Sequence, residues 1–210
     1  MKNHLLTPDL YDYKYLPVKK NWRKFKEGYP DSIIIHYTAG STLNGAVRHL
    51  RNPKIAASAH IVIGRKGEIV QLVPFNIESW HAGRSSYKGR SGWNKFSIGI
   101  ELDNNGKLNA THEGGKTVYT DYWGHIIEPE NVHLRESDNT FWHTYSNDQI
   151  KICFDICHSL QSTYGINIIL GHEEIAPIRK KDPGPAFPLN RLRDRITEKI
   201  VPEYLHMKGL

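Results

Sequence analysis

The sequence of 210 residues contains no long apolar run, no internal repeat and no low-complexity tract. No stretch approaches the roughly 20 apolar residues that a membrane-spanning helix requires, so we expect no membrane span. Residues 1–26 mix Lys, Asp, Pro and Tyr without the apolar core of a secretory signal peptide, which predicts synthesis in the cytoplasm without that export route. With 39% hydrophobic and 24% charged residues, the chain has the composition of an ordinary folded domain.

Cysteine is scarce, with only Cys153 and Cys157 present. Their spacing of four places both on one face of a predicted helix but is poor geometry for a disulfide. We interpret them as small buried core residues. A cysteine-based zinc site would need further thiols or well-placed histidines.

The net charge is +6 and the isoelectric point is about 9.2, with basic clusters at 19–26 and 179–195. Nucleic acid and anionic cell-wall polymers both fit such a charge. Nucleic-acid binding would call for an organised basic face with aromatic residues that stack on bases, which the sequence does not indicate, so we expect no nucleic-acid partner. A solvated basic surface is the plain alternative.

Short β-branched runs alternate with segments of helical spacing, which predicts one α/β domain with a central mixed β-sheet flanked by helices. The predicted strands are 32–36, 59–63, 68–73, 96–102 and 166–170, and the predicted helices are 43–52, one from 147 to about 165, and 189–205. We divide the chain into an N-terminal arm (1–30) and a domain (31–210). Residues 107–146 are polar, rich in Tyr, Trp and His and without clear periodicity, so we expect a long inserted loop region or lid.

Three reactive side chains lie at or just past predicted strand ends, namely His36, Glu101 and His172. A strand end holds a side chain rigidly, which favours a functional site. Zinc in hydrolases typically takes three nitrogen or oxygen ligands and keeps one position for water. The two histidines and Asp182, in the Pro/Gly-rich loop 180–185, would supply such a set. Twelve histidines also form chance pairs, so spacing alone leaves surface or core roles open.

Wider segments carry a family resemblance. They are IIIHYTAG (33–40), SAHIVIGRKGEIVQLVP (58–74), WHAGRSSYKGR (80–90), FSIGIEL (96–102) and GHEEIAPIRKKDPGPAF (171–187). In this order they resemble the signature blocks of the zinc-dependent N-acetylmuramoyl-L-alanine amidases, most closely the AmpD-type branch, while phage lysis amidases share the fold. The last block is the most specific, because His, Ala-Pro, Arg-Lys and Asp-Pro-Gly match in register.

The resemblance implies zinc-dependent hydrolysis of the amide bond between N-acetylmuramic acid and L-alanine, in peptidoglycan or in muropeptides. It implies zinc ligands at His36, His172 and Asp182 and catalytic roles for Glu101 and Lys180. Zinc lowers the pKa of bound water, and Glu101 can take its proton and pass it to the leaving amine. Zinc and Lys180 can stabilise the oxyanion. A solvent-facing carboxylate and a surface lysine are the plain alternatives.

The same blocks imply substrate-groove positions for His60, Trp80, His81 and Arg84. Arg84 and Arg90 could pair with peptide carboxylates through charge-assisted bonds. The alternatives are a hydrogen-bonded strand histidine for His60, a core position for Trp80, and a solvated surface position for Arg84 and Arg90.

One position departs from the phage lysozyme-like branch, where a catalytic Tyr precedes the histidine of the second block. Here that position is Ala59. Glu101 must then carry the proton transfer.

A second function class is a non-catalytic peptidoglycan-binding module of the same fold, which typically lacks a metal ligand. The presence of all three predicted ligands favours the enzyme. Within the enzyme class, recycling of soluble muropeptides and lysis of intact wall both fit. The basic arm and the insertion at 107–146 offer extra surface for polymeric wall, which leans toward lysis.

Overall fold

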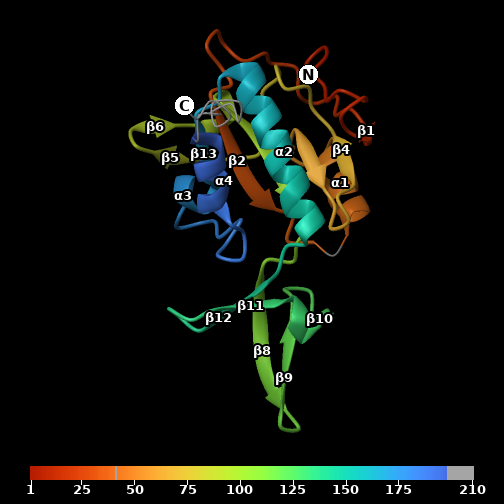
Figure 1. Cartoon of the computed structure of the whole chain (residues 1–210), viewed down its shortest axis with the longest axis vertical. Coiled ribbons are helices and arrows are strands. Elements are labelled where there is room, and N and C mark those ends of the chain that lie inside the picture. Colours follow the sequence, from red (N-terminus) through yellow and green to blue (C-terminus); the bar gives the residue numbers. More distant parts are fainter. Residues whose placement is uncertain (41, 198–210) are drawn as a thin grey trace, which may run out of the picture.

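The computed structural model describes residues 1–40 and 42–197 and places a six-stranded mixed sheet at the centre of the fold (Figure 1). Its strands are β1 (Tyr13–Tyr15), β2 (Ser32–Tyr37), β3 (Ile61–Ile63), β4 (Ile69–Gln71), β7 (Ser97–Leu102) and β13 (Ile168–Gly171). The strand order is β1-β4-β3-β7-β2-β13, and every neighbouring pair is parallel except β3 with β4. The predicted mixed α/β fold is confirmed.

Helices cover both faces of this sheet. They are α1 (Leu43–Arg51), α2 (Asn147–Tyr164), the single turn α3 (His172–Ile175) and α4 (Leu189–Thr197). Helices α2 and α4 pack on one face, while α1 and α3 pack on the other. Local sequence sets their limits, since the Ser146 hydroxyl caps the start of α2 and Gly165, at φ 69°, ends it. The predicted continuation of α4 to residue 205 lies outside the described residues.

The isoleucine run of β2 shows how the sheet presents the site. Ile33 and Ile35 pack against α2, whereas Ile34 packs on the opposite face beside Trp93 and Ile175. Each fully buried isoleucine stabilises the fold by about 1.5–3 kcal/mol. Because successive strand residues alternate between faces, His36 follows Ile34 and faces the side of α1 and α3.

The N-terminal arm is part of the sheet rather than an extended segment lying over it. Strand β1 pairs in parallel with β4 and forms the sheet edge. Leu6 and Val18 are buried, and the Leu6 amide donates to the side chain of Gln71. The arm therefore closes one edge of the core.

Residues 107–146 are not the long loop that the sequence predicted, because they form a second, antiparallel sheet. Its strands are β8 (Lys107–Glu113), β9 (Lys116–Thr120), β10 (Ile126–Ile127), β11 (Val132–Arg135) and β12 (Thr140–His143), in the order β10-β9-β8-β12-β11. We call it the insertion sheet, and Figure 1 shows it projecting from one end of the main domain. Its strands bury few side chains, so they lack the apolar alternation that would have revealed them.

Smaller elements complete the described structure. They are the ribbon β5 (Ser86–Tyr87) with β6 (Arg90–Ser91) and the 3₁₀ turns Trp93–Lys95 and Pro129–Asn131. Within the described residues, every helix is too short or too polar to cross a membrane.

Candidate metal centre

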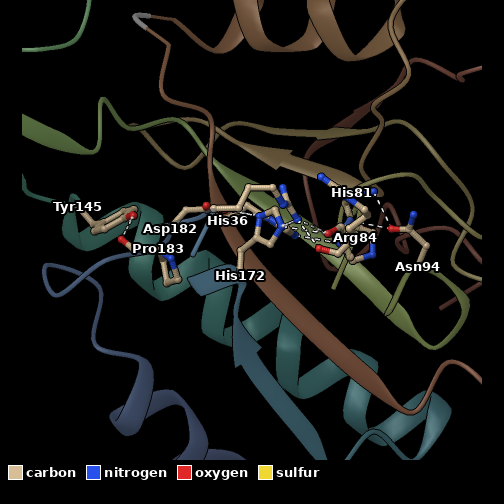
Figure 2. Close-up of polar contacts among 10 residues, drawn as sticks. His36, His81, Arg84, Asn94, Tyr145, His172, Asp182 and Pro183 are labelled. Atoms are coloured by element: carbon tan, nitrogen blue, oxygen red, sulfur yellow. Dashed lines mark hydrogen bonds and ion pairs between the residues drawn. The ribbon is translucent and has the colours of Figure 1, made fainter. Parts of the chain in front are cut away.

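Three buried side chains converge at the carboxyl end of the central strands. His36 lies near the end of β2, His172 follows β13, and Asp182 lies in the loop after α3. The His36 Nδ1 atom is 2.8 Å from His172 Nδ1 and 3.0 Å from Asp182 Oδ2, and the last two atoms are 2.9 Å apart. Figure 2 shows the three side chains pointing at one another. Two nitrogens and one carboxylate oxygen so arranged are able to hold a metal ion.

A neighbouring histidine fixes which nitrogen of His36 faces the cluster. The His81 Nε2 atom is 3.1 Å from the Ser97 carbonyl oxygen, so it donates, and His81 Nδ1 is left as an acceptor. That acceptor is 2.9 Å from His36 Nε2. His36 therefore donates from Nε2 and presents the Nδ1 lone pair to the cluster.

His172 is oriented in the same way by a backbone carbonyl. Its Nε2 atom is 3.2 Å from the oxygen of Ala82 and 3.3 Å from Arg179 Nη2. Arg179 Nη2 already donates to the carbonyls of Ala82 and Arg84, at 2.8 and 2.9 Å. Because one guanidinium nitrogen carries only two hydrogens, His172 Nε2 is the donor toward Ala82. The Nδ1 lone pair again faces the cluster.

The protonation states match those of a metal site. Burial, assisted by the neighbouring His172, lowers the pKa of His36 to about 4. Burial alone would raise the pKa of Asp182, but the contacts with His172 and His36 hold that pKa below its ordinary value. At neutral pH, His36 is a neutral imidazole beside an ionised carboxylate, the states that bind a cation.

The loop that carries Asp182 is fixed from two sides. The Tyr145 hydroxyl donates to the carbonyl of Pro183 at 2.7 Å (Figure 2). Trp142 lies against Gly184, where any side chain would collide with the indole ring. A glycine at φ 72° is therefore required at this point, and the base of the insertion sheet supports the metal loop.

Glu101 lies directly beside His36, because β2 and β7 pair in register at these two residues. Its Oε2 atom is buried and has no hydrogen-bond partner among the described residues, while the residue as a whole is partly exposed to the groove. Burial, and then the charge of Asp182, raise the pKa of Glu101 to about 8, while Lys180 opposes the shift. A buried carboxyl oxygen without a partner costs about 1–3 kcal/mol, so its retention beside the cluster indicates a chemical role.

A groove of about 940 Å³ opens over the cluster. It is lined by the three cluster residues together with residues predicted for catalysis or binding, namely Glu101, Lys180, Trp80 and His81. Arg179, Trp123 and His125 also line it and were missed from the sequence. Arg179 adjoins Lys180 in a basic run, whereas the two insertion residues lie outside every recognised block.

Other predicted residues lie outside the groove lining. His60 is fully buried, receives the Gly99 amide on Nδ1 at 3.0 Å and donates from Nε2 to the Ile77 carbonyl at 2.9 Å. Arg84 contributes its backbone carbonyl to Arg179. Arg90 forms an ion pair with Asp31 at 2.8 Å. His81 lines the groove, yet its two ring nitrogens are occupied by His36 and Ser97, as Figure 2 shows for the His36 side.

Comparison with known proteins agrees with this geometry. The family described as N-acetylmuramoyl-L-alanine amidase matches residues 26–185. The 1,6-anhydro-N-acetylmuramyl-L-alanine amidase AmpD of Citrobacter freundii is 37% identical over 153 residues, which are 72% of this chain and 60% of the relative. The AmpD of Escherichia coli strain K12 is 36% identical over 155 residues, 73% of this chain and 63% of the relative. The chain thus spans about 60% of the length of these curated relatives.

Solved structures show the same likeness. A crystal structure of a selenomethionine AmpD derivative superposes with a TM-score of 0.63 at 27% identity, over 94% of this chain and 99% of that one. The amidase AmiD from E. coli, in complex with the substrate anhydro-N-acetylmuramic acid-L-Ala-D-gamma-Glu-L-Lys, superposes with a TM-score of 0.59 at 27% identity. The match covers 82% of this chain and 60% of that one. Family match, fold and cluster agree, and the chain belongs to the N-acetylmuramoyl-L-alanine amidase family.

Proposed function

We propose that this chain is a zinc-dependent amidase that hydrolyses the bond between the lactyl group of N-acetylmuramic acid and L-alanine. The observation that carries the proposal is the convergence of two histidine Nδ1 atoms and one carboxylate beside the buried, unpaired carboxyl oxygen of Glu101. Neutral imidazoles and a carboxylate are ligands that zinc accepts, and three protein ligands leave a position for the reacting water. Residues 31–210 would form the amidase domain, with 107–146 as an elaboration of it.

His36, His172 and Asp182 would hold the zinc ion. When bound, zinc supplies a Lewis acid that lowers the pKa of a water molecule and polarises the scissile carbonyl. Glu101 would take a proton from the attacking water as the water oxygen bonds to the carbonyl carbon. A bound cation would lower the pKa of Glu101 from about 8, so that the carboxylate is available as a base at neutral pH.

The bond to nitrogen then breaks. Glu101 returns the proton to the leaving nitrogen, which departs as the free amino group of L-alanine, and the lactyl group is left as a carboxylic acid. Lys180 lines the groove, and its ammonium group would stabilise the negative charge on the attacked carbonyl oxygen. Trp80 would offer an aromatic face to the substrate, and His81 would orient His36 rather than contact the substrate.

A peptidoglycan-binding module is the second candidate. The three ligands and Glu101 are all present and lie together, which favours the enzyme. The AmpD relatives are named as 1,6-anhydro-N-acetylmuramyl-L-alanine amidases, so soluble anhydro-muropeptides are the first substrates to test. Intact peptidoglycan contains the same type of amide bond and is the second.

The test is digestion of purified peptidoglycan and of soluble anhydro-muropeptide side by side, with products identified by mass spectrometry. We expect free stem peptide and a lactyl carboxylic acid, loss of activity in excess chelator and recovery on adding zinc. Full activity in chelator with no bound metal would exclude the mechanism. Binding without cleavage by the zinc-loaded protein would favour the binding module.

A further inference from the structure

One turn of the insertion sheet reaches the groove. Among the described residues of the insertion, Trp123 and His125 line the groove, and both belong to the turn 121–125 between β9 and β10. Most of the insertion sheet projects away from the main domain, as Figure 1 shows. Among its described residues, the insertion therefore contacts the groove only through this short turn.

Asp121 builds this turn. Its carboxylate is buried, and Oδ1 accepts from the backbone amides of Trp123 and His125, both at 2.9 Å. Oδ2 accepts from the side chain of Asn105 at 2.6 Å and contacts His125 Nδ1 at 2.9 Å. Gly124 supplies the φ of 85° that the turn requires. Asn105 lies three residues beyond β7, so the turn is tied to the strand that carries Glu101.

Trp123 links the turn to the segment that follows β2, which also lines the groove. Its indole Nε1 donates to the carbonyl of Ala39 at 3.0 Å, and Ala39 lies three residues beyond His36. The indole is nevertheless 64% exposed. With its only polar atom satisfied, the ring has a fixed orientation and an apolar face left for a ligand.

The surroundings of Trp123 are also aromatic and exposed. Tyr122 is 80% exposed and meets Trp123 edge to face at a centroid distance of 5.1 Å. Trp80, which is 41% exposed, lines the same groove. Large exposed aromatic residues gathered at a groove contribute little to folding and mark a binding surface.

Charge does not explain this surface. Residues 107–146 contain three Lys or Arg and six Asp or Glu, so the insertion is acidic within a basic chain. An anionic wall polymer would not be attracted by that charge. The ligand chemistry that fits is a neutral one with an apolar face, and the C–H face of a pyranose ring stacks on indole by dispersion.

We propose that Trp123, supported by Tyr122 and fixed by Asp121, is a saccharide-stacking platform that selects substrates carrying a sugar beyond the muramic acid residue. The inference rests on the proposed amidase function, because it assigns the extra sugar to the groove that holds the scissile bond. The platform determines specificity and takes no part in the proton transfers.

The test compares two substrates with the same stem peptide, a muramoyl-peptide and an N-acetylglucosaminyl-muramoyl-peptide. We expect Trp123→Ala to lower kcat/KM for the disaccharide substrate about 10-fold, mainly through KM. For the monosaccharide substrate, kcat/KM should fall by about twofold at most. Trp123→Phe keeps an aromatic ring, so it should retain more than half of the preference for the disaccharide over the monosaccharide substrate. Equal losses on both substrates, or no loss on either, would overturn the proposal.

The control is Trp22→Ala, because Trp22 is a 75% exposed tryptophan outside the groove lining. Trp22→Ala should leave kcat/KM unchanged for both substrates. If it lost the preference for the disaccharide to the same extent as Trp123→Ala, the proposal would be overturned. A second measurement is calorimetric titration with the peptide-free disaccharide, for which Trp123→Ala should weaken binding about 10-fold. If the wild-type protein cleaves neither substrate, the amidase proposal fails. If it cleaves both and the variant keeps the preference, only the platform fails.

Discussion

The central sheet and the insertion sheet are built on different principles. Strands β2 and β7 bury almost every side chain and have helices on both faces, so a residue at their ends has little freedom. The insertion sheet is largely solvated, and its buried apolar side chains include Leu108 and Trp142 near its base. The central sheet thus holds the side chains of the site rigidly, whereas the insertion presents most of its side chains to solvent.

The two sheets meet at the loop that carries Asp182. Trp142, in β12, packs against Gly184, two residues beyond Asp182. The turn 121–125 of the insertion instead reaches the groove through Trp123. This division predicts that changes in the central sheet affect metal binding and turnover, and that changes in the turn 121–125 affect substrate preference.

The largest effect should come from Glu101, in the central sheet. Glu101→Gln keeps the volume of the side chain but removes the base, so we expect kcat to fall by about 10²–10⁴-fold while bound zinc is retained. Zinc content and kcat are measured on the same preparation. Glu78→Gln is the control, because that carboxylate is partly buried but lies outside the groove lining. Turnover near that of the wild type would reassign the base.

His81 should show the next largest effect. His81→Ala leaves His36 Nε2 without its acceptor, and loss of such a partner typically weakens metal binding by about 10–100-fold. Zinc affinity is measured by competition with a chromophoric chelator. His143→Gln is the matched control, since it is a buried histidine of the insertion sheet that does not contact the cluster. Equal zinc affinities in the two variants would contradict the assignment of His81 as a positioning residue.

The buried histidines also predict how stability depends on pH. Burial lowers the pKa of His60 to about 4, below the ordinary value near 6.5. Between these pH values the unfolded chain binds a proton that the folded chain does not, so stability falls as pH drops from 6.5 toward 4. For His60 alone the loss between pH 7 and pH 5 is about 2 kcal/mol.

Urea unfolding at the two pH values checks this effect. His60→Gln should be less stable at pH 7 but should show a smaller loss on acidification than the wild type. The same slope in both proteins would mean that His60 does not titrate between these pH values. The effect belongs to the central sheet, because His60 lies outside the groove lining and the insertion.

How far the sequence predicts these regions depends on burial. The isoleucine run of β2 and the helical spacing around Cys153 predict their elements because one side is apolar and enclosed. Strand β1 and the insertion strands lack that signal, and pairing geometry alone defines them. The ligand set came from the residues and the family resemblance, but the role of His81 did not. It depends on Gly99, where a side chain would collide with the His81 ring, and such space is invisible in a single sequence.

Shortening the insertion tests the division between the two sheets most directly. Leu108 and Phe141 are paired partners in β8 and β12, so residues 109–140 can be replaced by an Asn-Gly turn that closes a hairpin. This variant keeps Trp142 against Gly184 and removes the turn 121–125. We expect zinc affinity within about threefold of the wild type, because the three ligands and their partners belong to the main domain.

The preference for a substrate with an additional sugar should fall about 10-fold in the same variant, as in Trp123→Ala. The matched control is Trp142→Ala in the full-length chain, which removes the indole that packs against Gly184 and keeps the turn 121–125. It should lower stability by about 3–5 kcal/mol, and it should weaken zinc binding more than it alters preference. If the shortened variant loses zinc, residues 109–140 are scaffold for the metal centre, and the contrast between the two sheets does not hold.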